Sequence, residues 1–331
     1  MKPLFSSSLA PVLDRYVGMK RALGRKFDSA THALQSLDRL LVKDGFRDLS
    51  VAAFDAWCKA YEHLASGVRR VRMLEVHAFC LYRRRTEPEC FLPDPRTFPP
   101  YHQRIRPHIF TESEVARLLD AASRLNRNLS TPLRPELTRL AIVLLFTTGI
   151  RRGELLNLVE GDYNRQQATL HIRATKFYKA RLLPIHEGIA NEIDTYLSTR
   201  ARLKLPSSPS TPLIWNAIRG GRAYTGTGLS YCIKPLLEEC GIKAANGFTP
   251  RIHDFRHSFA VNALLRWYRA GTDVDAKLPL LATYLGHGSA LSTHHYLHFI
   301  EPMRVAASER FARLYGTLVI PPALNKKGQL R

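Results

Sequence analysis

The chain has 331 residues, 45% of them apolar, which suits two globular domains with buried cores. Its net charge of +21 predicts a polyanionic partner, and both parts are basic: residues 1–100 hold 17 Lys/Arg against 11 Asp/Glu, the remainder 32 against 17. No apolar run approaches the roughly 18 residues of a membrane span, the first residues fail as a secretory signal, and the five cysteines form no CxxC pair. We therefore expect a soluble cytoplasmic protein with reduced thiols.

The first 88 residues are predicted to form a bundle of four helices, over 8–23, 28–45, 50–64 and 67–85. Asp28 and Ser50 are placed to cap the second and third helices. The last helix is rich in arginine, usually the mark of a solvated face. Because the whole chain is so basic, we expect a phosphate-facing surface there instead, formed by Arg69, Arg70, Arg72, Arg83 and Arg84.

Residues 89–107 contain five prolines, which remove helix donors and favour extended geometry. This segment is predicted to be a linker between two domains. Arg104 extends the basic surface into it.

The second domain is predicted to cover residues 108–316, with a tail at 317–331. A capping box, TESE at 111–114, begins a helix through 125, and an apolar, central helix follows at 137–146. Another helix begins at Arg151, after a break at 147–149. Residues 168–185 alternate as a β-hairpin with Lys176 and Lys179 at its tip, and later helices are expected at 188–203, 228–240 and 301–315. The predicted fold class is mainly α with a small β-hairpin or sheet.

Residues 252–300 gather cationic groups, imidazoles and a phenol between apolar runs. His253 and Arg256 are three apart, so a helix would place them on one face, where they could grip an anion. His287 follows in LGHG, and Tyr296 comes nine residues later. A phenol beside basic groups is a possible nucleophile.

Four segments in this order resemble the tyrosine recombinase (phage integrase) family. They are TTGIRRGELLNL with Arg151, TKFYKARLLPI with Lys176, HDFRHSFA with His253 and Arg256, and LGHGSALSTHHYLHF with His287 and Tyr296. The resemblance covers about residues 111–315. The helical bundle before the prolines is similar to the family's core-binding domain, which binds DNA. The subgroup suggested is Xer-like or transposon-borne.

The resemblance implies a role for each matching residue. Tyr296 would attack a DNA phosphodiester to give a 3'-phosphotyrosyl link and a free 5'-hydroxyl. Arg151 and Arg256 would clamp the phosphate, and Lys176 would protonate the leaving oxygen, with Lys179 as the alternative. His253 would accept the tyrosine proton or hold the phosphate, and His287 would donate a further hydrogen bond. Glu154 is expected to orient a guanidinium without reacting, and Lys179 to contact DNA.

The resemblance also implies site-specific recombination of double-stranded DNA by a homo-tetramer, or by a hetero-assembly with related recombinases, in association with the nucleoid. We expect no metal, cofactor or ATP to be required. Two alternatives keep the fold: a strand-relaxing enzyme similar to type IB topoisomerases, and a catalytically silent DNA-binding protein.

Overall fold

The structure is a computed structural model that describes residues 3–25, 27–101, 106–173 and 180–286. The chain divides into two compact units, Met1–Ile105 and Arg106–Arg331, and each is described by itself. The predictions for Arg104, Lys176, Lys179, His287 and Tyr296, and for residues 301–331, lie outside the described residues.

Four helices form the first unit, as predicted. They are α1 (Ala10–Ala22), α2 (Asp28–Lys43), α3 (Val51–Lys59) and α4 (Ser66–Arg83). Their apolar faces meet in a core that contains Leu34 and Phe79, both fully buried. Ser50 caps α3 as predicted, since its side chain accepts a hydrogen bond from the Ala53 amide at 3.2 Å. Asp28, by contrast, is the first residue inside α2 and not its cap.

The proline-rich segment begins as part of the first unit. Cys90 and Phe98 are buried there, and a short 3-10 turn, η1 (Pro95–Thr97), lies between these two residues in the sequence. Arg70 fastens this stretch to α4, because its Nη1 donates to the carbonyl oxygens of Phe98 and Pro99, each at 3.1 Å. Residues 89–101 therefore pack against the bundle, where the sequence predicted an open linker.

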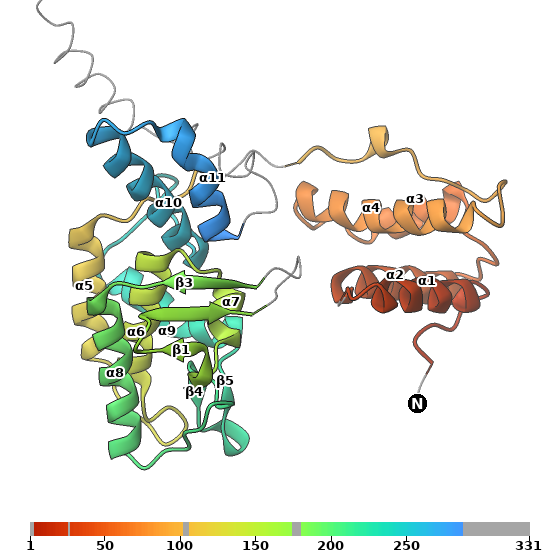
Figure 1. The fold of residues 1–331 in the computed structure, drawn as a ribbon. Coiled ribbons are helices and arrows are strands. Elements are labelled where there is room, and N and C mark those ends of the chain that lie inside the picture. Colours follow the sequence, from red (N-terminus) through yellow and green to blue (C-terminus); the bar gives the residue numbers. More distant parts are fainter. Residues whose placement is uncertain (1–2, 26, 102–105, 174–179, 287–331) are drawn as a thin grey trace, which may run out of the picture. The chain divides into compact units, whose positions relative to one another are not determined.

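The described part of the second unit contains seven helices, one of which is central. They are α5 (Glu112–Ser123), α6 (Arg134–Thr148), α7 (Arg152–Asn157), α8 (Glu187–Arg202), α9 (Gly226–Glu239), α10 (Ile252–Arg269) and α11 (Val274–Leu285). α6 is apolar on nearly all sides and packs against α5, α7, α8, α9 and α10, which confirms its predicted central place (Figure 1). The predicted capping box at Thr111 and Glu114 begins α5.

A three-stranded antiparallel sheet lies across these helices (Figure 1). Its strands are β1 (Tyr163–Asn164), β2 (Thr169–Ile172) and β3 (Arg181–Pro184), in that order. β2 and β3 are the two strands of the predicted hairpin, and Ile172 pairs with Arg181 at the end of their ladder nearest the tip. β1 and a second small sheet, β4 (Trp215–Asn216) with β5 (Arg222–Ala223), were not predicted.

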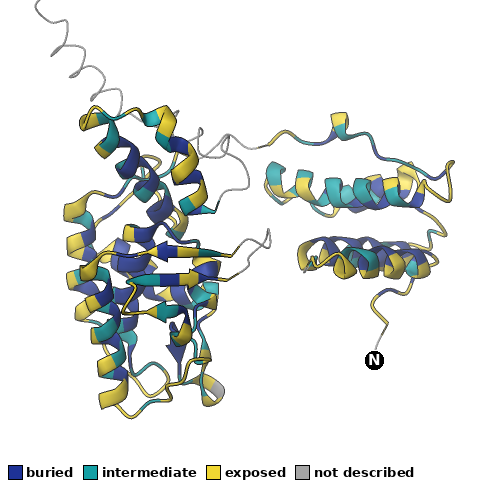
Figure 2. Cartoon of the chain, viewed as in Figure 1, coloured by how far each residue is buried: buried dark blue, intermediate teal, exposed yellow. Residues whose placement is uncertain are grey.

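Two apolar clusters hold the second unit together. The larger surrounds α6, and the smaller joins α10 to α11 through buried residues such as Leu264 and Leu281. Figure 2 shows the buried faces turned inward in both units. No helix among the described residues is long and apolar enough to cross a membrane.

Candidate active site

A tight turn after α6 delivers Arg151. α6 ends at Gly149, whose φ of 61° lies in the left-handed region that favours glycine. A Cβ at this position would lie 2.6 Å from a ring carbon of Phe259, so glycine is also required by space. Arg151 then adopts an extended conformation as the residue that precedes α7. The break predicted at 147–149 thus occurs at Gly149 alone, because α6 continues through Thr147 and Thr148. This glycine turns the chain toward the site.

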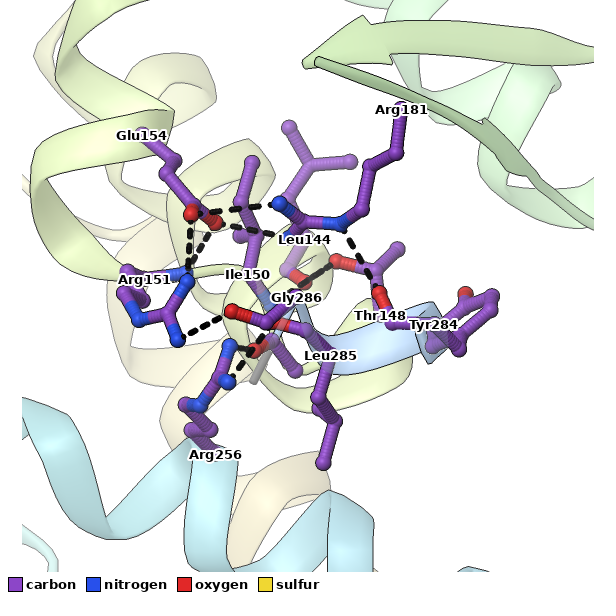
Figure 3. Close-up of polar contacts among 11 residues, drawn as sticks. Leu144, Thr148, Ile150, Arg151, Glu154, Arg181, Arg256, Tyr284, Leu285 and Gly286 are labelled. Carbon is purple, nitrogen blue, oxygen red and sulfur yellow. Dashed lines mark hydrogen bonds and ion pairs between the residues drawn. The ribbon is translucent and has the colours of Figure 1, made fainter. Parts of the chain in front are cut away.

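Glu154 lies between two guanidinium groups. Its carboxylate accepts from Arg151 Nη1 at 2.7 Å and the Arg151 amide at 3.1 Å, and from Arg181 Nη2 at 2.8 Å and Nη1 at 3.2 Å (Figure 3). Burial alone would raise the pKa of Glu154, but the hydrogen bonds and charge of Arg181, and then the hydrogen bonds of Arg151, lower it to about 2. Glu154 is therefore ionised at neutral pH. Arg181 was not among the predicted site residues.

Three arginines hold the end of α11 by its last three carbonyl groups. Arg181 Nε donates to the carbonyl oxygen of Tyr284 at 2.8 Å, Arg256 Nη2 to that of Leu285 at 2.7 Å, and Arg151 Nη2 to that of Gly286 at 2.7 Å (Figure 3). Carbonyl groups at a helix C-terminus carry partial negative charge and lack partners within the helix. The guanidinium groups supply those partners.

Arg256 joins two of these segments. It lies on α10, is only 2% exposed, and its Nη1 donates to the carbonyl oxygen of Gly149 at 2.7 Å. The same side chain therefore contacts the turn that precedes Arg151 and the end of α11. Arg151 and Arg256, predicted from separate motifs, are brought together on the two sides of Gly286 (Figure 3).

His253 lies one turn before Arg256 on α10 and keeps an exposed edge. Partial desolvation of its ring, followed by the positive charges of Arg256, Arg251 and Arg151, lowers the pKa of His253, against a smaller opposite effect of Asp254. Its ring meets that of His257 edge-on, with centroids 4.8 Å apart. The lowered pKa of His253 favours the neutral imidazole.

A pocket of about 730 Å³ opens beside these residues. Its lining includes Arg151, Arg152, Lys234, Arg251 and His253, and among the described residues that line it none is acidic. The arrangement suits a phosphodiester, because guanidinium and ammonium groups at the wall can neutralise phosphate oxygens. Within the described part of the chain, no three His, Cys, Asp or Glu side chains gather as a metal site.

Only part of the arginine surface predicted on α4 is exposed and able to contact a ligand. Arg69, Arg70 and Arg72 are half-buried, and Arg72 stacks on the ring of Tyr61 at 4.3 Å. Arg84 is exposed, although its Nε donates to the carbonyl oxygen of Cys90 at 3.2 Å.

Arg83 is placed differently from the prediction. It is buried, 7% exposed, and its guanidinium pairs with the carboxylates of Asp48 and Glu87. A buried arginine paired in this way holds the bundle together and does not face a ligand. Arg83 is therefore left out of the proposed DNA-binding surface.

Comparisons with known proteins agree with the motif pattern. The model of the phage integrase family matches residues 108–301. Two putative integrase/recombinases of Sinorhizobium fredii are 30% and 29% identical to this chain, covering 93% and 92% of it and 98% and 96% of their own lengths. Tyrosine recombinase XerA of Thermococcus kodakarensis is 31% identical over 61% of each chain.

Solved structures show the same fold at low identity. XerH site-specific recombinase, bound to palindromic difH substrate, matches with a TM-score of 0.62 and 17% identity over 95% of this chain and 84% of that chain. The Tn1549 transposon integrase in complex with transposon right end DNA matches with a TM-score of 0.60 and 14% identity over 92% and 99%. The mainly helical fold class is confirmed. The chain therefore belongs to the phage integrase family, as its motifs predicted, and is a site-specific tyrosine recombinase.

Proposed function

We propose that the pocket beside Arg151 and His253 receives the DNA phosphodiester that is cut. The phenolic oxygen of Tyr296 attacks the phosphorus, which gives a 3'-phosphotyrosyl link and releases a 5'-hydroxyl protonated by Lys176. His253 accepts the tyrosine proton or holds the phosphate, and His287 donates a further hydrogen bond. The observation that carries this proposal is that Arg151 and Arg256 bind the adjacent carbonyl groups of Gly286 and Leu285, and that Arg151 also lines a cationic pocket.

The charge of the pocket supports this chemistry. Negative charge grows on the phosphate oxygens in the transition state, and planar guanidinium groups stabilise it without reorganising. The Arg151 side chain is 29% exposed, so it can reach a ligand while Glu154 holds it. Arg256 is buried, but each terminal nitrogen carries two hydrogens and can donate to a carbonyl and a phosphate oxygen at once.

The length of the chain is compatible with Tyr296 as the nucleophile. Tyr296 follows Gly286 by ten residues. Ten residues span at most about 33–36 Å when fully extended, so the Cα of Tyr296 lies within that distance of the Cα of Gly286. This reach allows attack on a phosphate held by the same protomer or by a neighbour.

For the assembly, we infer a homo-tetramer on paired sites of double-stranded DNA, or a hetero-assembly with related recombinases, acting at the nucleoid. The net charge of +21 supports binding to DNA phosphates by both units. The proposed DNA contacts of the first unit are Arg69, Arg70, Arg72, Arg84 and Arg104. Lys179 is a proposed DNA contact of the second unit.

The test uses a duplex that the wild-type protein selects from a random-sequence library. A nicked version of that duplex traps a covalent intermediate, because the short strand beyond the cut diffuses away. We expect a denaturant-resistant adduct with wild type, and none with Tyr296→Phe, which should still bind DNA. Tyr284→Phe is the control. An adduct that survives in Tyr296→Phe would refute the assignment of the nucleophile.

A strand-relaxing enzyme would act on a single site. Supercoiled plasmids with one or two copies of the selected duplex separate the two activities. We expect deletion or inversion products only from the plasmid with two copies. Relaxation of both plasmids without recombinant products would instead favour the topoisomerase-like activity.

A further inference from the structure

Arg181 is fully engaged inside the second unit. Its Nε donates to the Tyr284 carbonyl oxygen at 2.8 Å, and its Nη1 and Nη2 donate to the two carboxylate oxygens of Glu154 at 3.2 and 2.8 Å. The side chain is only 12% exposed. Each of its three nitrogens thus has an acceptor within the protein, which distinguishes it from Arg151 at the pocket wall.

The location of Arg181 connects three segments of the site. It is the first residue of β3 and pairs with Ile172 where the ladder ends, next to the hairpin tip that carries Lys176 in the sequence. Its guanidinium contacts Glu154 on α7 and the end of α11. One side chain therefore fastens the base of the hairpin to the two segments that hold Arg151 and lead to His287.

Gly286 makes room for this contact. A Cβ at Gly286 would lie 2.7 Å from Arg181 Nη1 and 3.4 Å from Arg151 Nη1, and the φ of this residue is +67°. Glycine is needed both for the backbone conformation and for the close approach of the guanidinium groups. The glycine of the LGH motif and Arg181 thus depend on each other.

The charge of the cluster gives Arg181 a second effect. Arg151 and Glu154 alone would form a neutral pair, which would weaken the attraction of Arg151 for a phosphate. With Arg181 sharing the same carboxylate, two guanidinium groups face one carboxylate, and the cluster keeps a net positive charge. Arg181, which is largely buried and supplies the extra positive charge, does not itself have to contact the DNA.

We propose that Arg181 is a positioning residue of the recombination reaction: it holds Glu154 and the end of α11 so that Arg151 presents a positively charged guanidinium to the scissile phosphate. The inference rests on the proposed function of the pocket. Because misplacement of a catalytic group by about 1 Å can cost about 10²-fold in rate, we expect Arg181→Gln to slow single-turnover cleavage by about that factor. DNA affinity should change much less.

The test measures single-turnover cleavage of the selected nicked duplex, with either an ordinary phosphate or an uncharged methylphosphonate at the cut. A neutral diester has less need of a charged clamp, so we expect the defect of Arg181→Gln to shrink on the methylphosphonate. A defect of equal size on both substrates would indicate general damage to the fold and overturn the proposal, as would cleavage of the phosphate at the wild-type rate.

Controls keep the outcome interpretable. Arg165→Gln removes an exposed arginine that pairs with Glu187 and Asp194 on the same unit, and it should cleave as wild type does. If Arg181→Gln does not fold, Arg181→Lys carries the same comparison, because lysine keeps the charge but lacks the planar fork. Failure of the wild-type protein itself to form an adduct would refute the proposed function and is thereby distinguishable.

Discussion

Replacing Glu154 with glutamine tests the buried charge cluster most directly. The carboxylate is 1% exposed and accepts hydrogen bonds from the guanidinium groups of Arg151 and Arg181, which are themselves 29% and 12% exposed. Breaking a buried ion pair typically costs about 3–5 kcal/mol. We expect the lower end, about 3 kcal/mol, because glutamine keeps one acceptor oxygen and Arg151 is partly solvated. For a unit of this size the melting temperature should fall by about 6–12 °C.

The pH dependence gives a second, independent expectation. The pKa of Glu154 is lowered from 4.5 to about 2 in the folded protein, so its stabilising effect is complete above pH 4.5 and is lost as the pH falls toward 2. The difference in melting temperature between wild type and Glu154→Gln should therefore be constant from pH 5 to 8 and should narrow below 4.5.

Thermal melts of matched variants provide the measurement. Glu187→Gln is the control, since Glu187 also pairs with an arginine but is 65% exposed, and its loss should cost no more than about 1 kcal/mol. Melting of Glu154→Gln within about 1 °C of wild type at pH 7 would contradict the reasoning. A difference in melting temperature between wild type and Glu154→Gln that stays constant down to pH 2 would show that the charge of Glu154 is not the stabilising feature.

Two further predictions are measured in thermal melts, and a third is measured as DNA affinity at several salt concentrations. Gly149→Ala should destabilise the second unit by about 1–3 kcal/mol, because a left-handed backbone would carry a Cβ only 2.6 Å from a ring carbon of Phe259. Gly18→Ala is the control, since Gly18 is exposed within α1 and its Cβ would meet nothing within 4 Å. It should stabilise the first unit by about 0.5–1 kcal/mol. Arg83→Gln should lower the free energy of unfolding by about 1.5–3 kcal/mol, because hydrogen bonds to charged carboxylates are lost. Arg85 is exposed, so Arg85→Gln should change the free energy of unfolding by no more than about 0.5 kcal/mol. Lys234→Gln should lower the slope of log affinity against log salt by about 1 if this lining residue contacts a phosphate, and an unchanged slope would exclude that contact.

The sequence predicted the helices well, because the signals that specify a helix are local. The apolar run at 137–146, the capping box at Thr111 and the alternation of 168–185 each depend on neighbours within one element. The break before Arg151 was also visible, since glycine after a long apolar helix signals a left-handed end. The structure lengthens the helix predicted at 137–146, ends the helix that begins at the capping box two residues earlier than predicted, and leaves the order of the elements unchanged.

The missed features depend on contacts between distant segments. Arg181 shares the inward face of β3 with Leu183, while Leu182 between them is 64% exposed. An arginine on the buried side of a strand requires acceptors within the protein, so strand alternation could have indicated Arg181, but not that Glu154 is its partner. Sequence patterns likewise could not identify the partner of Arg83, because Asp48 is 35 residues away, or the packing of Phe98 on the bundle.

The end of α11 shows why the motifs of this family form one unit of structure. Arg151, Arg181 and Arg256 come from three different elements, yet each donates to one of three consecutive carbonyl groups. Moving α11 would therefore break a hydrogen bond of every one of them, and displacing any one arginine would release part of the helix end. Since the chain continues from Gly286 directly to His287, the segment that carries the proposed nucleophile begins at this shared anchor. The anchoring contacts thus couple the proposed phosphate clamp to the start of the segment that must reach it.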